Sequence, residues 1–233
     1  MTDSYVALDV ETTGLDPKRD KIIEIGMVKV RSGKIAAQFE SFVNPGRPLT
    51  ERIIELTGIQ NEQLSDARDI GEIMPEVLRF IGDDILVGHR ILFDYSFIKK
   101  AAVNHRYTFE KTGIDTLKLA KTFLPDLESR SLAFLCGHYG IEHNAHRAFA
   151  DARAASDLYQ KLAMLFYQGN ETAFTPKRLL YQVKRETPIT IPQKEQLYKL
   201  LDRHKLKVDY QVEKLTRNEA SRIIAQLLAE YGR

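Results

Sequence analysis

Two carboxylates stand two positions apart in the segment V-A-L-D-V-E-T-T-G, where they are Asp9 and Glu11. The apolar run from Tyr5 to Val10 predicts a short buried strand. Because side chains on a strand alternate between its two faces, Asp9 and Glu11 should project to the same side. Like charges this close repel each other unless a cation neutralises them, and Mg²⁺ and Mn²⁺ prefer such oxygen ligands. Taken alone, the pair is interpreted more simply as a cap at the end of a strand.

A third carboxylate, Asp94, follows a second buried strand that we predict over Ile85–Gly88 in the segment G-H-R-I-L-F-D. Asp94 opens an apolar-periodic stretch that predicts a helix. An aspartate in the first turn is favoured by the helix dipole without any function. His89 and Phe93 flank Asp94, and a ring on a cleft wall could stack on a sugar or a base. A place in the hydrophobic core suits Phe93 equally well.

The third group consists of His146 and Asp151 in A-H-R-A-F-A-D-A. Apolar residues at helical spacing predict a long helix over Ala148–Tyr167, with Asp151 one turn inside it. We place His146 on the preceding loop, where it could move independently of Asp151. Imidazole titrates near neutrality and can take a proton from water, so His146 suits a general base beside bound metal ions. The other histidines that we expect to be surface or capping residues are His105, His138, His143 and His204.

In this order and spacing, the three motifs resemble those of the DEDD superfamily of 3′→5′ exonucleases. The likeness is to the subgroup whose last motif is H-x-x-x-x-D, which includes the epsilon proofreading subunit of bacterial DNA polymerase III and the exonuclease domain of Gram-positive polymerases. D-V-E-T-T-G-L at 9–15 is similar to the first motif, H-R-I-L-F-D at 89–94 to the second, and H-R-A-F-A-D-A at 146–152 to the third. The resemblance covers residues 4–167.

The resemblance implies hydrolysis of phosphodiesters with two divalent cations, Mg²⁺ or Mn²⁺. The implied metal ligands are Asp9, Glu11, Asp94 and Asp151. His146 would remove a proton from the attacking water. The implied substrate is the 3′ end of single-stranded DNA or RNA, from which nucleoside 5′-monophosphates are released. The positions expected to bind substrate are Thr12, Thr13, Gly14, Leu15, His89 and Phe93.

Substrate and pathway stay open at the level of sequence. The family usually has Asn after the histidine of the second motif, whereas this chain has Arg90, which could contact a substrate phosphate or point outward. The favoured function is a DNA 3′→5′ exonuclease acting in proofreading or repair. The alternative is an RNA exonuclease of the RNase T or oligoribonuclease kind, because no residue reads a 2′-hydroxyl decisively.

Two further functional classes are less favoured. A nucleic-acid-binding module on a degenerate nuclease fold would not need all five expected catalytic positions to be filled. An endonuclease of the ribonuclease H or transposase type would share the acidic residues, but the H-x-x-x-x-D motif disfavours it. These 233 residues include no polymerase domain, so proofreading would require a polymerase or replisome partner in trans.

The order of the predicted elements indicates an α/β fold. Strands over Tyr5–Val10, Ile22–Val30 and Lys34–Val43 come first, the last two joined as a hairpin through Ser32–Gly33. Helices and one further strand follow. This order is typical of a mixed sheet flanked by helices, as in the ribonuclease H-like architecture. We assign residues 1–170 to an exonuclease domain of this kind.

Composition narrows the class of protein further. Of the 233 residues, 43% are hydrophobic, which is enough for a real core. The single cysteine, Cys136, excludes a disulfide framework and a cysteine-based zinc site. The sequence shows no signal peptide and no span of eighteen apolar residues, so we expect a cytoplasmic protein without a membrane partner.

The C-terminal part differs in pattern and charge. We interpret residues 171–187 as a basic linker and residues 188–233 as a small helical appendage. Its helices, over Pro192–His204 and Asn218–Tyr231, would pack on each other or on the exonuclease domain, and T-R-N-E at the second helix start predicts a capping box. Residues 171–233 carry thirteen Lys and Arg against eight Asp and Glu. This charge favours holding a substrate strand, although solvated helix faces or partner docking would explain it too.

Overall fold

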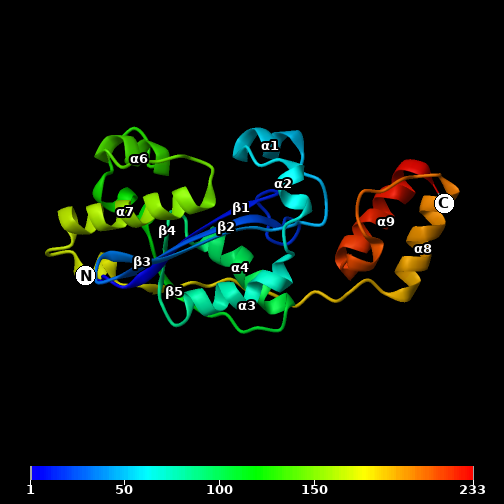
Figure 1. The fold of residues 1–233 in the computed structure, drawn as a ribbon, viewed down its shortest axis with the longest axis horizontal. Coiled ribbons are helices and arrows are strands. Elements are labelled where there is room, and N and C mark those ends of the chain that lie inside the picture. The colour runs from blue at the N-terminus through cyan, green and yellow to red at the C-terminus, as the bar shows by residue number, and fades with distance from the viewer. Residues whose placement is uncertain (1, 233) are drawn as a thin grey trace. The chain divides into compact units, whose positions relative to one another are not determined.

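Six strands form one mixed sheet, in the order β3-β2-β1-β4-β5-β6, in the computed structural model, which describes residues 2–232 (Figure 1). β2 runs antiparallel to both β1 and β3, and β6 runs antiparallel to β5. β4 pairs parallel with β1 and with β5. The strands are β1 (Tyr5–Thr12), β2 (Ile22–Arg31), β3 (Lys34–Phe42), β4 (Leu86–Gly88), β5 (Thr112–Asp115) and β6 (Lys177–Arg178). The predicted α/β class with a mixed sheet is confirmed.

Helices cover both faces of this sheet, and strand alternation decides what each face presents to them (Figure 1). Val6, Leu8 and Val10 pack in one core with α3 and α4, whereas Tyr5 and Ala7 pack in a second core with α5, α6 and α7. Among the described residues, no helix combines the length and hydropathy needed to cross a membrane. The helices up to this point in the fold are α1 (Glu51–Thr57), α2 (Asn61–Ser65), α3 (Ile70–Ile81), α4 (Leu92–Asn104), α5 (Thr116–Phe123), α6 (Leu132–Tyr139) and α7 (Ala148–Phe166).

The turn between β2 and β3 is the predicted hairpin. Ser32 and Gly33 have φ angles of 48° and 74°, left-handed values that suit a two-residue turn whose twist matches that of its strands. On the other side of β2, the pairing with β1 extends from Tyr5 opposite Val30 to Thr12 opposite Ile22. This long antiparallel pairing carries β2 to the end of β1 where the acidic residues stand.

Contacts divide the chain into two units, residues 1–45 with 49–183, and residues 46–48 with 184–233. The segment interpreted from the sequence as a basic linker, 171–187, therefore does not act as a linker over most of its length. Its first thirteen residues belong to the first unit, and the division between the units comes after Val183.

Two apolar side chains explain this difference. Phe174, at the end of the 3₁₀ helix η1 (Glu171–Phe174), is 2% exposed, and its ring centroid lies 5.6 Å from that of Phe123. Leu179 is also buried in the core, directly after β6 has paired with β5. The linker interpretation depended on nearby glycine, proline and basic residues, and it overlooked two apolar anchors whose burial stabilises this segment.

The second unit consists of two helices, α8 (Ile191–Arg203) and α9 (Arg217–Tyr231), with the 3₁₀ helix η2 (Val212–Lys214) between them. Each helix begins after a threonine, Thr190 or Thr216, that takes part in a capping box. Both helices and the capping box at the start of the second are confirmed. The helices pack on each other around a core of Ile189, Leu197, Leu200, Leu201, Val212, Ala220 and Ile224.

Candidate active site

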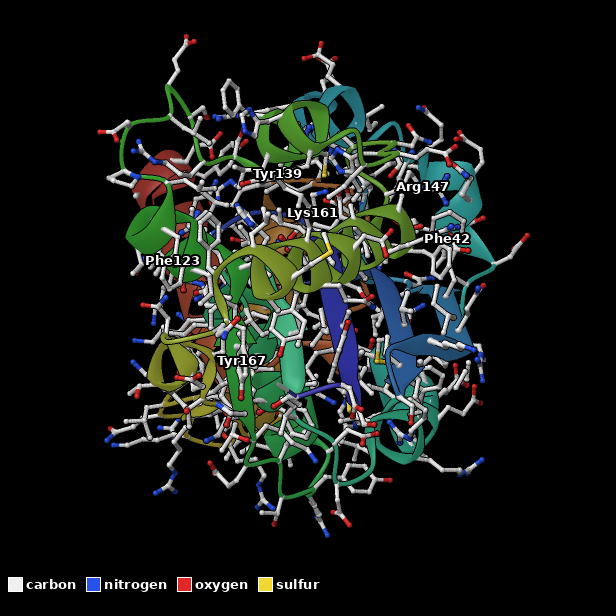
Figure 2. The ribbon with its side chains drawn as sticks, turned by 90° about the vertical axis from the view of Figure 1, so that its left-hand side faces the viewer. Phe42, Phe123, Tyr139, Arg147, Lys161 and Tyr167 are labelled. Carbon is white, nitrogen blue, oxygen red and sulfur yellow. The ribbon has the colours of Figure 1, made fainter. Side chains whose placement is uncertain are left out.

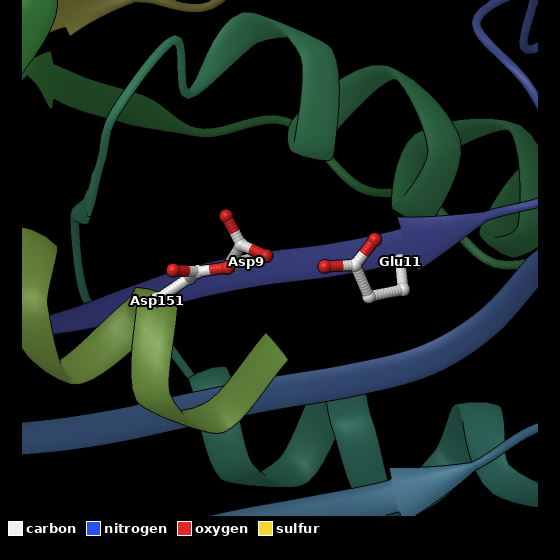
Figure 3. Close-up of side chains that lie close together, drawn as sticks. All are labelled: Asp9, Glu11 and Asp151. Carbon is white, nitrogen blue, oxygen red and sulfur yellow. The ribbon is translucent and has the colours of Figure 1, made fainter. Parts of the chain in front are cut away.

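The carboxylates of Asp9, Glu11 and Asp151 form one cluster, with ligand oxygens that all lie within 4.8 Å of one another (Figure 3). Asp9 and Glu11 project from β1 on the face that begins with Tyr5 and Ala7, as strand alternation requires. Because α7 packs on this face, Asp151 in its first turn reaches the two strand carboxylates. The structure thus brings the first and third motifs together.

Asp94 lies beside this cluster but is not one of its three members. It is 2% exposed in the first turn of α4, and its Oδ1 accepts a hydrogen bond from the backbone N–H of Val10 at 3.1 Å. Val10 separates Asp9 from Glu11 in the chain, so this bond ties the second motif to the first. Of the four predicted carboxylates, three therefore lie in one cluster. The fourth, Asp94, is buried beside them and accepts a hydrogen bond from the main chain of β1.

Burial and mutual repulsion raise the pKa values of these acids. Desolvation raises the pKa of Asp9 well above its ordinary value, and the charges of Asp94 and Asp151 raise it further. Burial likewise raises the pKa of Glu11 to about 7, with added repulsion from Asp151 and Glu24. A divalent cation would relieve this repulsion and favour the ionised carboxylates. The cluster therefore fits a divalent cation held by carboxylate oxygens.

The loop before α7 carries His146, whose backbone N–H donates to Oδ2 of Asp151 at 3.0 Å. The φ angle of His146 is 64°, in the left-handed region that costs a non-glycine residue some conformational energy. Its side chain is exposed. The main chain at His146 is thus fastened to Asp151 while the imidazole stays open to solvent. This location agrees with the predicted loop position, and the role of His146 as a base stays a prediction.

The sequence predicts a surface or capping role for His143, and this prediction is wrong. Nε2 of His143 contacts Oδ1 of Asp151, and the His143 side chain is only 8% exposed. The irregular loop 141–147 brings this ring against α7, and no periodicity marks which side chains of such a loop turn inward. The one signal in the sequence is that His143 and His146 share this loop. One oxygen of Asp151 therefore contacts the ring of His143, and the other accepts a hydrogen bond from the backbone N–H of His146.

His89 and Phe93, the expected stacking residues, are both fixed by the protein. Nδ1 of His89 lies 2.9 Å from Oγ1 of Thr116, and Nε2 lies 2.9 Å from the carbonyl oxygen of Arg130. Burial lowers the pKa of His89, which favours its neutral form. The ring of Phe93 is partly buried, with its centroid 5.0 Å from that of Phe97. Substrate contact by either side chain stays a prediction.

Arg90 stands where the family resemblance leads one to expect Asn, and its φ angle is 70°. Its backbone N–H donates to Oδ1 of Asp115 at 3.1 Å, and the same oxygen accepts the N–H groups of Leu117 and Lys118 at the start of α5. Asn adopts a left-handed backbone more readily than Arg, which is a physical reason for Asn at such a position. The Arg90 side chain is exposed, so it can make contacts with a ligand that an Asn side chain would not make.

The loop after β1 holds the remaining predicted substrate positions. Thr12 is buried, and its Oγ1 donates to the carbonyl oxygen of Gly14 at 2.6 Å. A Cβ atom on Gly14 would lie 2.5 Å from Oδ2 of Asp20, so this glycine makes room for a side chain of the same loop. Oγ1 of Thr13 donates to Oδ1 of Asp20 at 3.2 Å. Leu15, in contrast, is 81% exposed, an apolar side chain open to a ligand.

Comparison with known proteins decides the family. The sequence matches the exonuclease family of the RNase T type over residues 6–159. The chain belongs to this exonuclease family. The matched region begins in β1 and ends in α7, so it contains every member of the acidic cluster. The predicted membership of an exonuclease family is confirmed.

Two kinds of DNA polymerase III protein are similar to this exonuclease. The DNA polymerase III subunit epsilon of Aquifex aeolicus is 36% identical over 180 residues, which cover 76% of this chain and 89% of that protein. The PolC-type DNA polymerase III of Bacillus subtilis is 42% identical over 164 residues, which cover 69% of this chain but 11% of that protein. The exonuclease therefore spans most of the epsilon subunit and only a small part of the PolC-type relatives.

Solved structures of exonucleases share the fold. Exonuclease X, in complex with 5′-overhanging duplex DNA, has a TM-score of 0.58 and 23% identity, covering 70% of this chain and 92% of that chain. Exonuclease I of E. coli, in a zinc-bound complex with single-stranded DNA, has a TM-score of 0.64 and 18% identity, covering 75% of this chain and 42% of that chain. The predicted ribonuclease H-like arrangement of the sheet and its helices is confirmed.

Proposed function

We propose that this chain removes nucleotides from the 3′ end of single-stranded DNA, using two Mg²⁺ or Mn²⁺ ions, in proofreading or repair. The cluster of Asp9, Glu11 and Asp151 in a member of an exonuclease family is the observation that carries the proposal. Its relatives support DNA as the substrate, because both are named as DNA polymerase III proteins, and the two structural neighbours described above are complexes with DNA.

The roles of the residues follow from their chemistry. Asp9, Glu11 and Asp151 would hold the cations, with Asp94 as the fourth carboxylate. When bound, the cations supply Lewis-acid activation and neutralise charge on the phosphate and on the attacking and leaving oxygens. His146 takes a proton from the attacking water on a ring nitrogen, a role that suits an exposed imidazole.

The bonds made and broken define the product. The water oxygen bonds to phosphorus while the bond from phosphorus to the 3′ oxygen of the preceding nucleotide breaks. The released unit is a nucleoside 5′-monophosphate, and the 3′ oxygen of the shortened strand takes a proton from solvent. The exposed Leu15 would contact the terminal base, and the other positions expected to bind substrate are Thr12, Thr13, Gly14, His89 and Phe93. Arg90 is available for a strand phosphate.

For a proofreading role, we propose association with a polymerase or replisome partner in trans. The epsilon relative, which this chain matches over 89% of that protein's length, is a separate subunit of DNA polymerase III. An analogous association would bring this active site to a primer end. Repair needs no such partner, so a requirement for polymerase distinguishes the two roles.

The deciding test is digestion of DNA and RNA oligonucleotides of the same sequence, labelled at either end, with Mg²⁺ or Mn²⁺ and with Asp151→Ala as the inactive control. We expect early loss of a 3′ label, a descending ladder from a 5′ label, and faster digestion of DNA. Faster digestion of RNA would assign an RNA exonuclease instead. Cutting of circular single strands would assign an endonuclease, and no release from any 3′ end would leave only a binding module.

A further inference from the structure

We propose that Glu24, a buried carboxylate outside the acidic cluster, is a positioning residue that sets the first turn of α7 so that Asp151 meets Asp9 and Glu11. This inference rests on the proposed function, because it assigns the means by which one of its metal ligands is placed. Glu24 lies on β2, between β3 and β1 in the sheet, and is 123 positions from Arg147, its principal partner.

Glu24 is fully buried and its carboxylate is fully hydrogen-bonded. Oε1 accepts from Nε of Arg147 at 3.1 Å and from Nη2 at 2.8 Å, and Oε2 accepts from the backbone N–H of Ala148 at 3.0 Å. Arg147 is the N-cap residue of α7 and Ala148 is its first residue. A carboxylate at this point satisfies a free N–H of the helix start and interacts favourably with the helix dipole.

The register of the sheet relates Glu24 to the acidic cluster. Glu11 stands directly opposite Glu24, and Asp9 stands opposite Gly26. A Cβ atom on Gly26 would lie 2.1 Å from the backbone of Ala148, so this glycine lets α7 touch the sheet. Each β1 carboxylate therefore has, as its β2 partner, a residue that fixes the start of α7.

The hydrogen bond of the first helical turn transmits this position to the cluster. The N–H of Asp151 donates to the carbonyl oxygen of Arg147 at 2.9 Å. A shift of the N-cap away from β2 would carry Asp151 with it, and with it the carboxylate that completes the cluster. Glu24 is not among the three carboxylates whose ligand oxygens lie within 4.8 Å of one another, and its own oxygens accept from Arg147 and Ala148, so it acts through α7.

The neighbours of Arg147 provide a matched control. Its guanidinium also lies 3.2 Å from Oε1 of Glu40 and 5.5 Å from the ring centroid of Phe42. Figure 2 shows Arg147 beside Phe42. Glu40 therefore belongs to the same ion-pair network as Glu24, but its side chain is 49% exposed. Of these two glutamates, only Glu24 also accepts the N–H of Ala148. Removal of the Glu40 charge should leave the helix start in place.

The experiment compares full-length Glu24→Ala, Glu24→Gln and Glu40→Gln proteins. For Glu24→Ala we expect a loss of about 10–100-fold in Mn²⁺ affinity, measured calorimetrically without substrate, the usual effect of removing a partner that orients a ligand. We expect kcat to fall with it while KM for the oligonucleotide stays within about twofold of the parent. Glu24→Gln, which keeps the shape, should give a smaller loss, and Glu40→Gln should match the parent.

A control for stability separates positioning from folding. Leu162→Ala empties a buried site far along α7, so it should lower the thermal midpoint without changing Mn²⁺ affinity. If Glu24→Ala does not fold, the isosteric Glu24→Gln carries the test. Parental Mn²⁺ affinity and kcat in a folded Glu24 variant would overturn the proposal, as would an equal loss in Glu40→Gln. If the parent digests no oligonucleotide, the proposed function fails, yet the Mn²⁺ titration still tests the role of Glu24.

Discussion

Asp94 on α4 accepts a hydrogen bond at 3.1 Å from the backbone N–H of Val10, the residue between the two acidic side chains of β1. The two partners are 84 positions apart in the sequence. Burial raises the pKa of Asp94 well above its ordinary value, so its ionised form costs stability near neutral pH. The hydrogen bond from the N–H of Val10 lowers the pKa of Asp94 and so favours its ionised form. The carboxyl group of Asp94 therefore affects both the stability of the fold and the chemistry of the site. Substitutions can separate these two effects.

Asp94→Asn should raise the thermal midpoint of the protein at pH 8 in EDTA while abolishing exonuclease activity. The amide keeps an oxygen for the N–H of Val10 and removes the buried negative charge. Asp94→Ala should also be inactive but should gain less stability, because an unsatisfied buried N–H costs about 1–3 kcal/mol. Calorimetry of the three proteins measures the difference. A midpoint for Asp94→Asn below that of the parent would contradict this account of Asp94.

In EDTA, stability should fall as the pH rises from about 4.5 to about 7. Glu11 has a pKa of about 7 in the folded chain, against an ordinary value of 4.5, so the unfolded chain releases its proton first. The contribution of Glu11 to this loss is absent at lower pH, grows through this window and levels off at roughly 3 kcal/mol above it. Denaturant titrations at pH 4, 5, 6, 7 and 8 measure the loss. Glu11→Gln should flatten the profile, and an unchanged slope in that variant would assign the loss to other acids.

His146→Ala should slow turnover by about 10²–10⁴-fold, the usual contribution of a general base, without a comparable loss of Mn²⁺ affinity. The matched variant is His143→Ala, which removes the other loop histidine, the one whose ring contacts Asp151. We expect His143→Ala to retain most of its turnover, because its ring is buried against Asp151 and His146 is exposed. Single-turnover digestion at saturating Mn²⁺ compares the two. The opposite ranking would transfer the base assignment to His143.

Deletion of residues 184–233 should leave a folded nuclease that binds single-stranded DNA more weakly and with a flatter salt dependence. The deleted residues carry eleven Lys and Arg against seven Asp and Glu, and fewer released counterions mean a smaller salt slope. Fluorescence titrations at several salt concentrations measure both quantities. An unchanged slope would show that these charges are only solvated helix faces.

Deletion from residue 171 should behave differently, because it also removes Phe174, Leu179 and β6. The loss of one large buried aromatic side chain alone typically costs about 3–5 kcal/mol. We therefore expect the shorter protein, ending at residue 170, to unfold at a markedly lower temperature than the protein ending at residue 183. Equal thermal midpoints would contradict the assignment of residues 171–183 to the first unit.

The Cys136 thiol should be unreactive in the folded protein. It is 1% exposed, and burial, with added repulsion from Asp151 and Asp157, raises its pKa to about 11. Near pH 8 this lowers the thiolate fraction about 100-fold relative to an ordinary thiol with a pKa of 9. Labelling with a thiol-specific dye should be slow in buffer and complete in denaturant. Rapid labelling of the folded protein would show that the α6 region opens readily.

Local patterns predict much of this fold. Alternation in β1 places Asp9 and Glu11 on one face, and helical spacing places Asp151 one turn inside α7, so each local position follows from its own segment. The hairpin at Ser32–Gly33 and the capping box at Thr216 have turn and cap chemistry of their own. In each of these cases the residues that decide the structure lie within a few positions of one another.

The features that escape prediction depend on partners far away in the chain. His143 lies in an irregular loop, and only its contact with Asp151 shows that its ring turns inward. The sequence shows Glu24 only as a charged residue near the start of a mostly apolar strand, and its hydrogen bonds to Arg147 and Ala148 depend on the packing of α7. The burial of Phe174 requires the aromatic neighbours Phe123 from α5 and Tyr159 from α7, which no local periodicity reveals.

The edge strand β6 also affects the association of molecules of this protein with one another. β6 covers the outer side of β5, and it consists of two exposed, positively charged residues, Lys177 and Arg178. A short, charged outermost strand is a poor template for pairing with a strand of another chain. Without it, β5 would present unpaired backbone groups to solvent and to neighbouring molecules. At this edge of the sheet, the two residues of β6 therefore disfavour strand pairing between molecules.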